Sequence, residues 1–170
     1  VGIVFTAILH PYGLLNQFFR ALGLDFMAKN WLTDTKLALL SVCGVEIWKW
    51  SGFNMVIILA GLQAVPPEYQ EAATIDGANA WQKFWHIIFP GIRTIIALQL
   101  ILAIKGAASV FEIPYIITGG KMGTSTFVIK TIETGFQYQK IGLASAMAIV
   151  LLFIIIVITM IQKIFFKEEK

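Results

Sequence analysis

The sequence contains very little cysteine, histidine or charge. Among its 170 residues are one cysteine, two histidines and five prolines, and 14% of the residues are Asp, Glu, Lys or Arg. A lone cysteine cannot form an internal disulfide, and no second cysteine stands near a histidine to complete a metal site. We therefore expect no metal centre, and we expect Cys43 to pack as a small apolar residue within a helix.

Signatures of nucleic-acid binding and of catalysis are also missing. The net charge is +3, but the thirteen Lys and Arg residues are dispersed and form no basic patch, so no nucleic-acid partner is expected. Gly119-Gly120-Lys121 lacks the spacing and the following Ser or Thr of a phosphate-binding loop. His10 and His86 have no nucleophile and carboxylate arranged with them, and we expect both to be interfacial. We predict no catalytic residue and no enzyme.

What the sequence does contain is long apolar stretches. Hydrophobic residues make up 58% of the chain, and its mean hydropathy is +0.78. A helix needs about twenty mostly apolar residues to cross the hydrocarbon of a bilayer. Residues 37–62, 87–104 and 141–166 meet this requirement, and residues 1–9 are expected to be the end of a span whose beginning is missing. We predict an all-α integral membrane protein, with one N-terminally truncated transmembrane domain over 1–170.

The distribution of Lys and Arg says little about which side of the membrane each connection occupies. The expected connections are 12–36, 63–86 and 105–140, and the middle one carries the fewest cations, whereas cytoplasmic loops usually carry the most. The tail, with Lys163, Lys167 and Lys170, favours a cytoplasmic C-terminus. Because the spans alternate in direction, the middle connection would then be cytoplasmic too.

One pair of charges lies inside a predicted span. Glu46 and Lys49 are three residues apart, which is close enough on a helix for the two side chains to pair. One interpretation is a couple that faces other helices or the interface, beside Trp48 and Trp50. The other interpretation, a proton relay or a substrate contact, stays open because ionisable residues within spans are often functional.

The middle connection is predicted to form two short helices joined by a tight turn. Pro66 and Pro67 suit the start of a helix, and Gly77 can adopt the left-handed conformation that ends one. A second helix is expected from Ala78, and Pro90 marks its passage into the next span. Its apolar stripe consists of Trp81, Phe84, Trp85 and Ile88. Such a hairpin suits docking into a groove of another protein, and it also suits resting on the membrane surface.

The residues of this connection match a known signature. Glu71-Ala72-Ala73, three residues, Gly77, nine residues, Ile87, one residue and Phe89-Pro90 resemble the EAA loop of ATP-binding-cassette (ABC) importer permeases, with Phe89 in place of leucine. The resemblance implies a permease core of the MetI-like type and a cytoplasmic coupling loop over 64–90. It assigns contact with a cytoplasmic ATPase to Glu71, Ala72, Ala73, Asp76, Gly77 and Pro90.

Further segments are similar to the carbohydrate branch of these permeases, of the maltose and glycerol-phosphate type. They are Gly13-Leu14-Leu15-Asn16, Trp31-Leu32-Thr33-Asp34, 47–54, 60–66, Ile75-Asp76-Gly77-Ala78, Val110-Phe111-Glu112, Ile117-Thr118-Gly119-Gly120 and 142–146. The resemblance implies a bacterial inner-membrane subunit with a second permease subunit, two ATPase subunits and an extracytoplasmic sugar-binding protein as partners. ATP and Mg would be bound by the ATPases, so this chain would carry no cofactor of its own.

A sugar path through the membrane would require polar or aromatic side chains within or beside the spans. The candidates are Asn54, Gln99, Ser109 and Tyr115, and each of them is equally suited to a hydrogen bond between helices. The competing hypothesis is a secondary carrier or channel subunit that works without an ATPase, for which Glu46 and Lys49 are the sequence hint.

Overall fold

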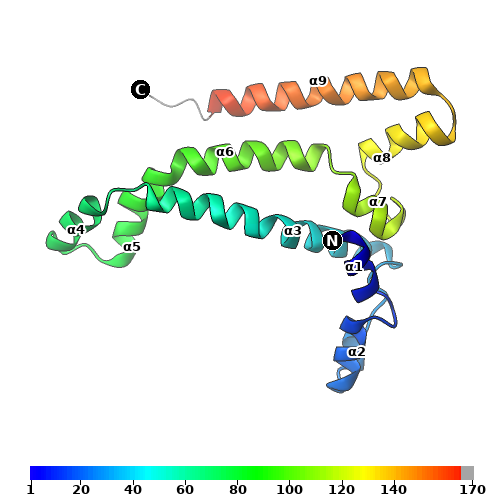
Figure 1. Ribbon diagram of the computed structural model, residues 1–170, viewed down its shortest axis with the longest axis horizontal. Coiled ribbons are helices and arrows are strands. Elements are labelled where there is room, and N and C mark those ends of the chain that lie inside the picture. Colours follow the sequence, from blue (N-terminus) through cyan, green and yellow to red (C-terminus); the bar gives the residue numbers. More distant parts are fainter. Residues whose placement is uncertain (166–170) are drawn as a thin grey trace. The chain divides into compact units, whose positions relative to one another are not determined.

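The fold consists of helices throughout the part of the chain that the computed structural model describes, residues 1–165 (Figure 1). The elements are α1 (Gly2–Ile8), α2 (Leu14–Ala21), η1 (Asp25–Met27), α3 (Thr35–Gln63), α4 (Pro67–Ile75), α5 (Ala80–Lys83), η2 (Phe84–Ile88), α6 (Phe89–Ala108), α7 (Glu112–Thr118), α8 (Phe127–Ile132), η3 (Glu133–Gln137) and α9 (Ile141–Phe165). The prediction of an all-α protein is confirmed. The chain divides into two compact units, one of 1–49 with 106–157 and one of 50–105 with 158–170.

Three helices are long and apolar enough to cross a membrane. They run over Thr35–Gln63, Ala80–Ala108 and Ile141–Ile164, so the three complete spans predicted from the sequence are confirmed. No residue is buried in the most apolar stretch of the last helix, where the side chain of Phe153 is 66% exposed. Lipid or other helices must cover such a surface. The predicted end of this span at Phe166 lies outside the described residues, as do Lys167 and Lys170.

The second span begins earlier than predicted. The span was predicted over 87–104, but the helix that contains it runs from Ala80 through α5, η2 and α6 to Ala108. The second hairpin helix was predicted from Ala78, and it starts slightly later, at Ala80, because Asn79 caps it. Pro90 does not interrupt it. The preceding turn is a π-helix in which the amide of Phe89 donates to the carbonyl of Phe84, and this wider turn accommodates the proline ring.

The first unit has an apolar core that joins three helices. Leu9 follows α1, Val42 and Val45 belong to α3, and Ile113 and Ile117 belong to α7; these five side chains form one buried cluster. Val42 and Val45 are three residues apart and so share one face of α3. The sequence predicted 105–140 as a connection, yet this region contains α7 and α8, helices too short to stand out by periodicity.

A buried polar side chain fixes the loop that precedes α3. Asn16 of α2 is 2% exposed, and its amide group makes four hydrogen bonds. Its Nδ2 donates to the carbonyl oxygens of Pro11 and Lys29, at 3.1 and 2.9 Å. Its Oδ1 accepts from the Lys29 amide at 3.2 Å and from the indole Nε1 of Trp31 at 2.8 Å. Both ends of the amide are thereby satisfied, as a buried polar group requires.

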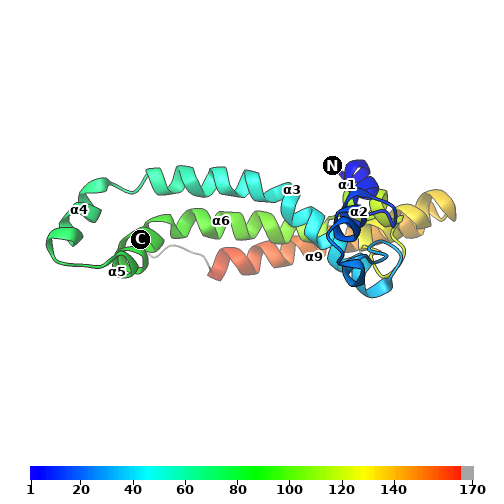
Figure 2. The same ribbon diagram turned by 90° about the horizontal axis from the view of Figure 1, so that it is seen from below.

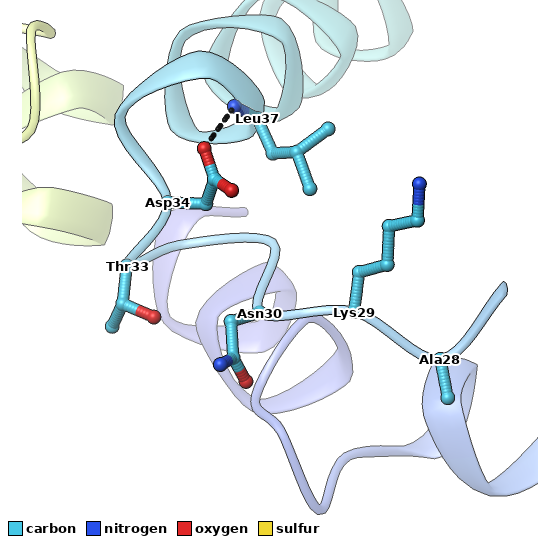
Figure 3. A pocket seen from close by; sticks show the side chains of 6 residues that line it. All are labelled: Ala28, Lys29, Asn30, Thr33, Asp34 and Leu37. Atoms are coloured by element: carbon cyan, nitrogen blue, oxygen red, sulfur yellow. Dashed lines mark hydrogen bonds between the residues drawn. The ribbon is translucent and has the colours of Figure 1, made fainter. Parts of the chain in front are cut away.

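The same loop lines a shallow polar depression at the start of α3 (Figure 3). The Asp34 carboxylate accepts from the amides of Lys36 and Leu37, at 2.8 and 3.4 Å, and so caps the helix. Figure 3 shows this carboxylate directed at the Leu37 amide, with Lys29 and Asn30 on the adjoining loop. Asp34 thus defines where α3 begins.

We expect the Asn16→Ala variant to lower the free energy of unfolding by about 1–3 kcal/mol, because it leaves the Trp31 indole and the Lys29 backbone without their buried partner. Thermal unfolding of the purified full-length subunit, followed by tryptophan fluorescence, measures the change. Asn30→Ala is the matched control, since this side chain is exposed. Equal losses in the two variants would contradict the structural role of Asn16.

Candidate functional site: the hairpin of α4 and α5

The region between the first two long helices forms a helical hairpin, as predicted (Figures 1 and 2). Helix α4 has Pro66 as its N-cap and Pro67 in its first turn. It ends in a Schellman motif, in which the Ala78 amide donates to the Ala73 carbonyl at 2.9 Å and the Gly77 amide to the Thr74 carbonyl at 3.1 Å. Gly77 has a φ of +78°, which is the left-handed conformation expected of it.

The second helix of the hairpin begins with a capping box. The side chain of Asn79 accepts from the Gln82 amide at 2.9 Å, and the Gln82 side chain accepts from the Asn79 amide at 2.9 Å. Lys83 then reaches back to α4 and donates to the Thr74 hydroxyl at 3.2 Å. Sequence reasoning missed Asn79 and Gln82, although their spacing, three residues apart at the start of an apolar stripe, is a readable capping signal.

The predicted coupling residues lie on different parts of the hairpin. Ala72, Ala73 and Asp76 line a groove together with Val65, Tyr69, His86, Ile87 and other residues of the same unit. Glu71 is exposed and does not line the groove, and Pro90 is exposed in the first turn of α6. Gly91 lines the groove opposite Val65, where an added Cβ would come within 2.8 Å of the valine. Small residues therefore shape this groove.

An exposed aromatic cluster follows the turn. The rings of Trp81, Phe84, Trp85 and Phe89 contact one another, with centroids 5.1 to 6.4 Å apart. Trp81 is 70% exposed, and Ile75 at the end of α4 is 87% exposed. The sequence analysis had predicted Ile88 as the last member of the apolar stripe, whereas the fourth ring of this cluster is that of Phe89. The hairpin thus presents apolar side chains that it does not bury itself.

Comparison with known proteins identifies the family of this chain. The family model described as "Binding-protein-dependent transport system inner membrane component" matches residues 1–168. The chain belongs to this family of inner membrane components.

Several relatives of this chain are named as permease proteins. A probable ABC transporter permease protein of Bacillus subtilis, YurN, is 36% identical over 173 residues, covering 100% of this chain and 59% of the relative. The osmoprotective compounds uptake permease protein GgtC of Synechocystis is 36% identical, covering 93% of this chain and 56% of the relative. The arabinooligosaccharides transport system permease protein AraP of Bacillus subtilis is 34% identical, covering 95% and 52%. The chain therefore spans little more than half the length of these relatives.

A solved structure has the same fold. The chain of a bacterial ABC transporter involved in the import of the acidic polysaccharide alginate superposes with a TM-score of 0.86. The match has 24% sequence identity and covers 95% of this chain and 57% of that chain. The predicted permease core is confirmed at the level of the fold.

The four predicted path residues of this inner membrane component are divided between its two units. Asn54 and Gln99 belong to one unit, and both are half-buried. Ser109 and Tyr115 belong to the other, where the Tyr115 ring stacks on Phe111 with centroids 4.9 Å apart. The Nε2 atom of Gln99 is buried and has no hydrogen-bond partner within residues 1–165, and the same holds for Gln162 of α9, which the sequence analysis did not select.

The charged side chain of Lys49 has a partner that the sequence did not indicate. Its Nζ lies 2.6 Å from Oε2 of Glu112, the first residue of α7. The hydrogen bond and the positive charge of Lys49 lower the pKa of the Glu112 carboxyl below its ordinary value, so this carboxyl is ionised at neutral pH. The ion pair joins α3 to α7 across 63 positions of the chain. Spacing of three along α3 had pointed to Glu46, and that pairing stays a prediction.

We expect the Gly77→Ala variant to lower the free energy of unfolding by about 1–2 kcal/mol, because a Cβ strains the left-handed conformation. The cost comes from the backbone alone, since no atom lies within 4 Å of the added Cβ. Gly77→Asn should lose less, because asparagine tolerates this conformation. Chemical unfolding of the purified subunit compares the two variants, and equal stability of Gly77→Ala and the wild type would contradict the assignment of the turn.

Proposed function

We propose that this chain forms part of the membrane-spanning permease subunit of a binding-protein-dependent ABC importer. The observation that carries the proposal is the hairpin. Its EAA pattern coincides with a helix, a left-handed glycine turn and a second capped helix, and the second helix continues directly into a span. The family assignment and the names of the relatives support the same function. They disfavour a carrier that works without an ATPase.

The hairpin, residues 64–90, is the proposed coupling loop. Glu71 meets a basic residue of the ATPase, where an exposed carboxylate forms a charge-assisted contact. Ala72, Ala73 and Asp76 shape the groove beside this contact, and Gly77 sets the angle between the two helices. Pro90 lies in the first turn of α6, within the long helix that carries the hairpin into the membrane. The exposed side chains of Ile75 and Trp81 offer the apolar area that a stable interface needs.

The partners and the orientation follow from this function. Two cytoplasmic ATPase subunits bind ATP and Mg and hydrolyse the nucleotide, a second permease subunit completes the path, and an extracytoplasmic sugar-binding protein delivers the cargo. The hairpin and the C-terminus then lie on the cytoplasmic side of a bacterial inner membrane. This chain supplies no catalytic residue, and it carries no cofactor.

The proposed cargo is a sugar or a related polyol. Relatives named for the transport of arabinooligosaccharides and of sulfoquinovosyl glycerol support this class. Asn54, Gln99, Ser109 and Tyr115 remain the proposed contacts along the path. The unpartnered amide of Gln99 favours this residue among them, because a buried donor without an acceptor is costly unless a ligand or another helix supplies one.

We expect the Glu71→Arg variant to reduce both co-purification of the ATPase and ATP-driven sugar uptake by at least about tenfold, since reversing a paired charge at an interface costs several kcal/mol. The measurement uses the complete importer reconstituted in proteoliposomes.

Glu68→Arg is the matched control, because it reverses a charge one turn earlier on the same helix. It is a demanding control for the stability of the helix. Glu68 lies in the first turn of α4, where a negative charge suits the helix dipole, so its reversal harms the helix more than that of Glu71. If the Glu71 variant retains assembly and uptake, the coupling assignment is wrong; if Glu68→Arg is equally defective, the effect comes from helix stability.

A further inference from the structure

The side chains of α3 that contact α7 continue into the ion pair of Lys49. Val42, Val45 and Lys49 are spaced by three and four residues, so they lie along one face of the helix. The two valines pack in the buried cluster with Ile113 and Ile117 of α7, and Lys49 pairs with Glu112 at 2.6 Å. An apolar contact and an ionic contact thus lie next to each other between the same two helices.

The two residues of this ion pair have different surroundings. Lys49 lies within the first span, and its side chain is 24% exposed. An ammonium in the hydrocarbon region needs an anionic or polar partner, and Glu112, whose side chain is 59% exposed, is one such partner. Ile113, the residue next to Glu112, is fully buried, and the adjacent Trp48 ring contacts Phe5 of α1 with centroids 5.0 Å apart. Helix α7 is therefore held by buried Ile113 as well as by the ion pair, and Trp48 joins α3 to α1 beside them.

Helix α3 connects this contact to the hairpin. It is one uninterrupted helix from Thr35 to Gln63, and three residues, Ala64 to Pro66, separate it from α4. On the other side of the contact between α3 and α7, helix α7 carries Tyr115, one of the proposed path residues. The helix ends at Gly119, which has a left-handed φ of +64°. A displacement of the hairpin can reach Tyr115 along α6, which ends at Ala108 shortly before α7, and it can also reach Tyr115 along α3 where α7 stays attached to α3.

We propose that Lys49 and Glu112 are positioning residues for transport, whose ion pair keeps α7 attached to α3 throughout the cycle and so transmits movement of the hairpin to the path. This inference rests on the proposed function. It differs from a role of Lys49 and Glu112 in binding the cargo, in which they would separate to contact sugar hydroxyls, and from a switch that opens in each cycle.

The first test is a charge-exchange series in the complete importer reconstituted with its ATPase and binding protein. Lys49→Met and Glu112→Gln each should reduce the amount of sugar transported per ATP hydrolysed by about fivefold, while ATP hydrolysis itself is retained. The double variant with Lys49→Glu and Glu112→Lys should recover to within about twofold of the wild type, because it restores the pair with opposite polarity.

The matched control removes an ion pair that lies within one segment. Lys130 and Glu133 are also 2.6 Å apart, but they are three residues apart in the sequence, one in α8 and the other in η3, which directly continues α8. Lys130→Met with Glu133→Gln should leave the transport ratio unchanged. Failure of the charge exchange to restore the ratio, or single variants that transport normally, would overturn the inference.

The second test distinguishes a permanent link from a switch. In a Cys43→Ala background, Lys49→Cys and Glu112→Cys are joined by a flexible reagent with two thiol-reactive ends, of about the length of the two native side chains. We expect uptake to survive cross-linking, whereas a block on cross-linking would show that the contact must open.

The outcomes for this inference and for the proposed function are separable. A wild-type importer without ATP-driven uptake would contradict the proposed function itself. Wild-type uptake combined with unaffected variants contradicts only the role of the ion pair. Single variants that raise the KM for sugar and leave the transport ratio intact would instead assign Lys49 and Glu112 to cargo binding.

Discussion

A backbone inside hydrocarbon must satisfy its own polar groups, and this constraint organises the whole chain. The three long helices run without a break through their apolar stretches, whereas the left-handed glycines, such as Gly77 and Gly119, fall between them. Pro90 is consistent with this constraint, because in the π-helical turn just before it the amide of Phe89 donates to the carbonyl of Phe84. A hairpin with a left-handed turn therefore belongs outside the hydrocarbon, where a soluble partner can reach it.

The hairpin keeps its shape through local backbone hydrogen bonds rather than through a core. The Schellman motif at Gly77 and the capping box of Asn79 and Gln82 define both sides of the turn. The side chains of Ile75 and Trp81 remain exposed as a result. The proposed coupling role would benefit from this division, because the hydrogen bonds that make the hairpin rigid leave its apolar side chains available to a partner.

Sequence reasoning succeeded where the signal is local and failed where it is not. Hydropathy over about twenty residues located all three spans, and the spacing from Glu71 to Pro90 located the hairpin with its turn at Gly77. Asn16 binds Trp31 and Lys49 binds Glu112 across 15 and 63 positions, and helical periodicity reports only neighbours three or four residues away. The helix start at Ala80 was missed because the cap at Asn79 was not considered. Buried amides such as that of Gln99 show their lack of a partner only once the helices are folded.

In the proposed topology, the hairpin and the loop before α3 lie on opposite sides of the membrane, with the hairpin on the cytoplasmic side. Single cysteines placed at Ile75 and at Asn30 in a Cys43→Ala background measure this, through labelling by a membrane-impermeant maleimide in right-side-out and inside-out vesicles. The vesicles come from cells that lack the ATPase, because the ATPase would cover Ile75. We expect Asn30→Cys to react in right-side-out vesicles and Ile75→Cys to react in inside-out vesicles. Reaction of both positions from the same side, or of Ile75→Cys from the outside, would contradict this topology.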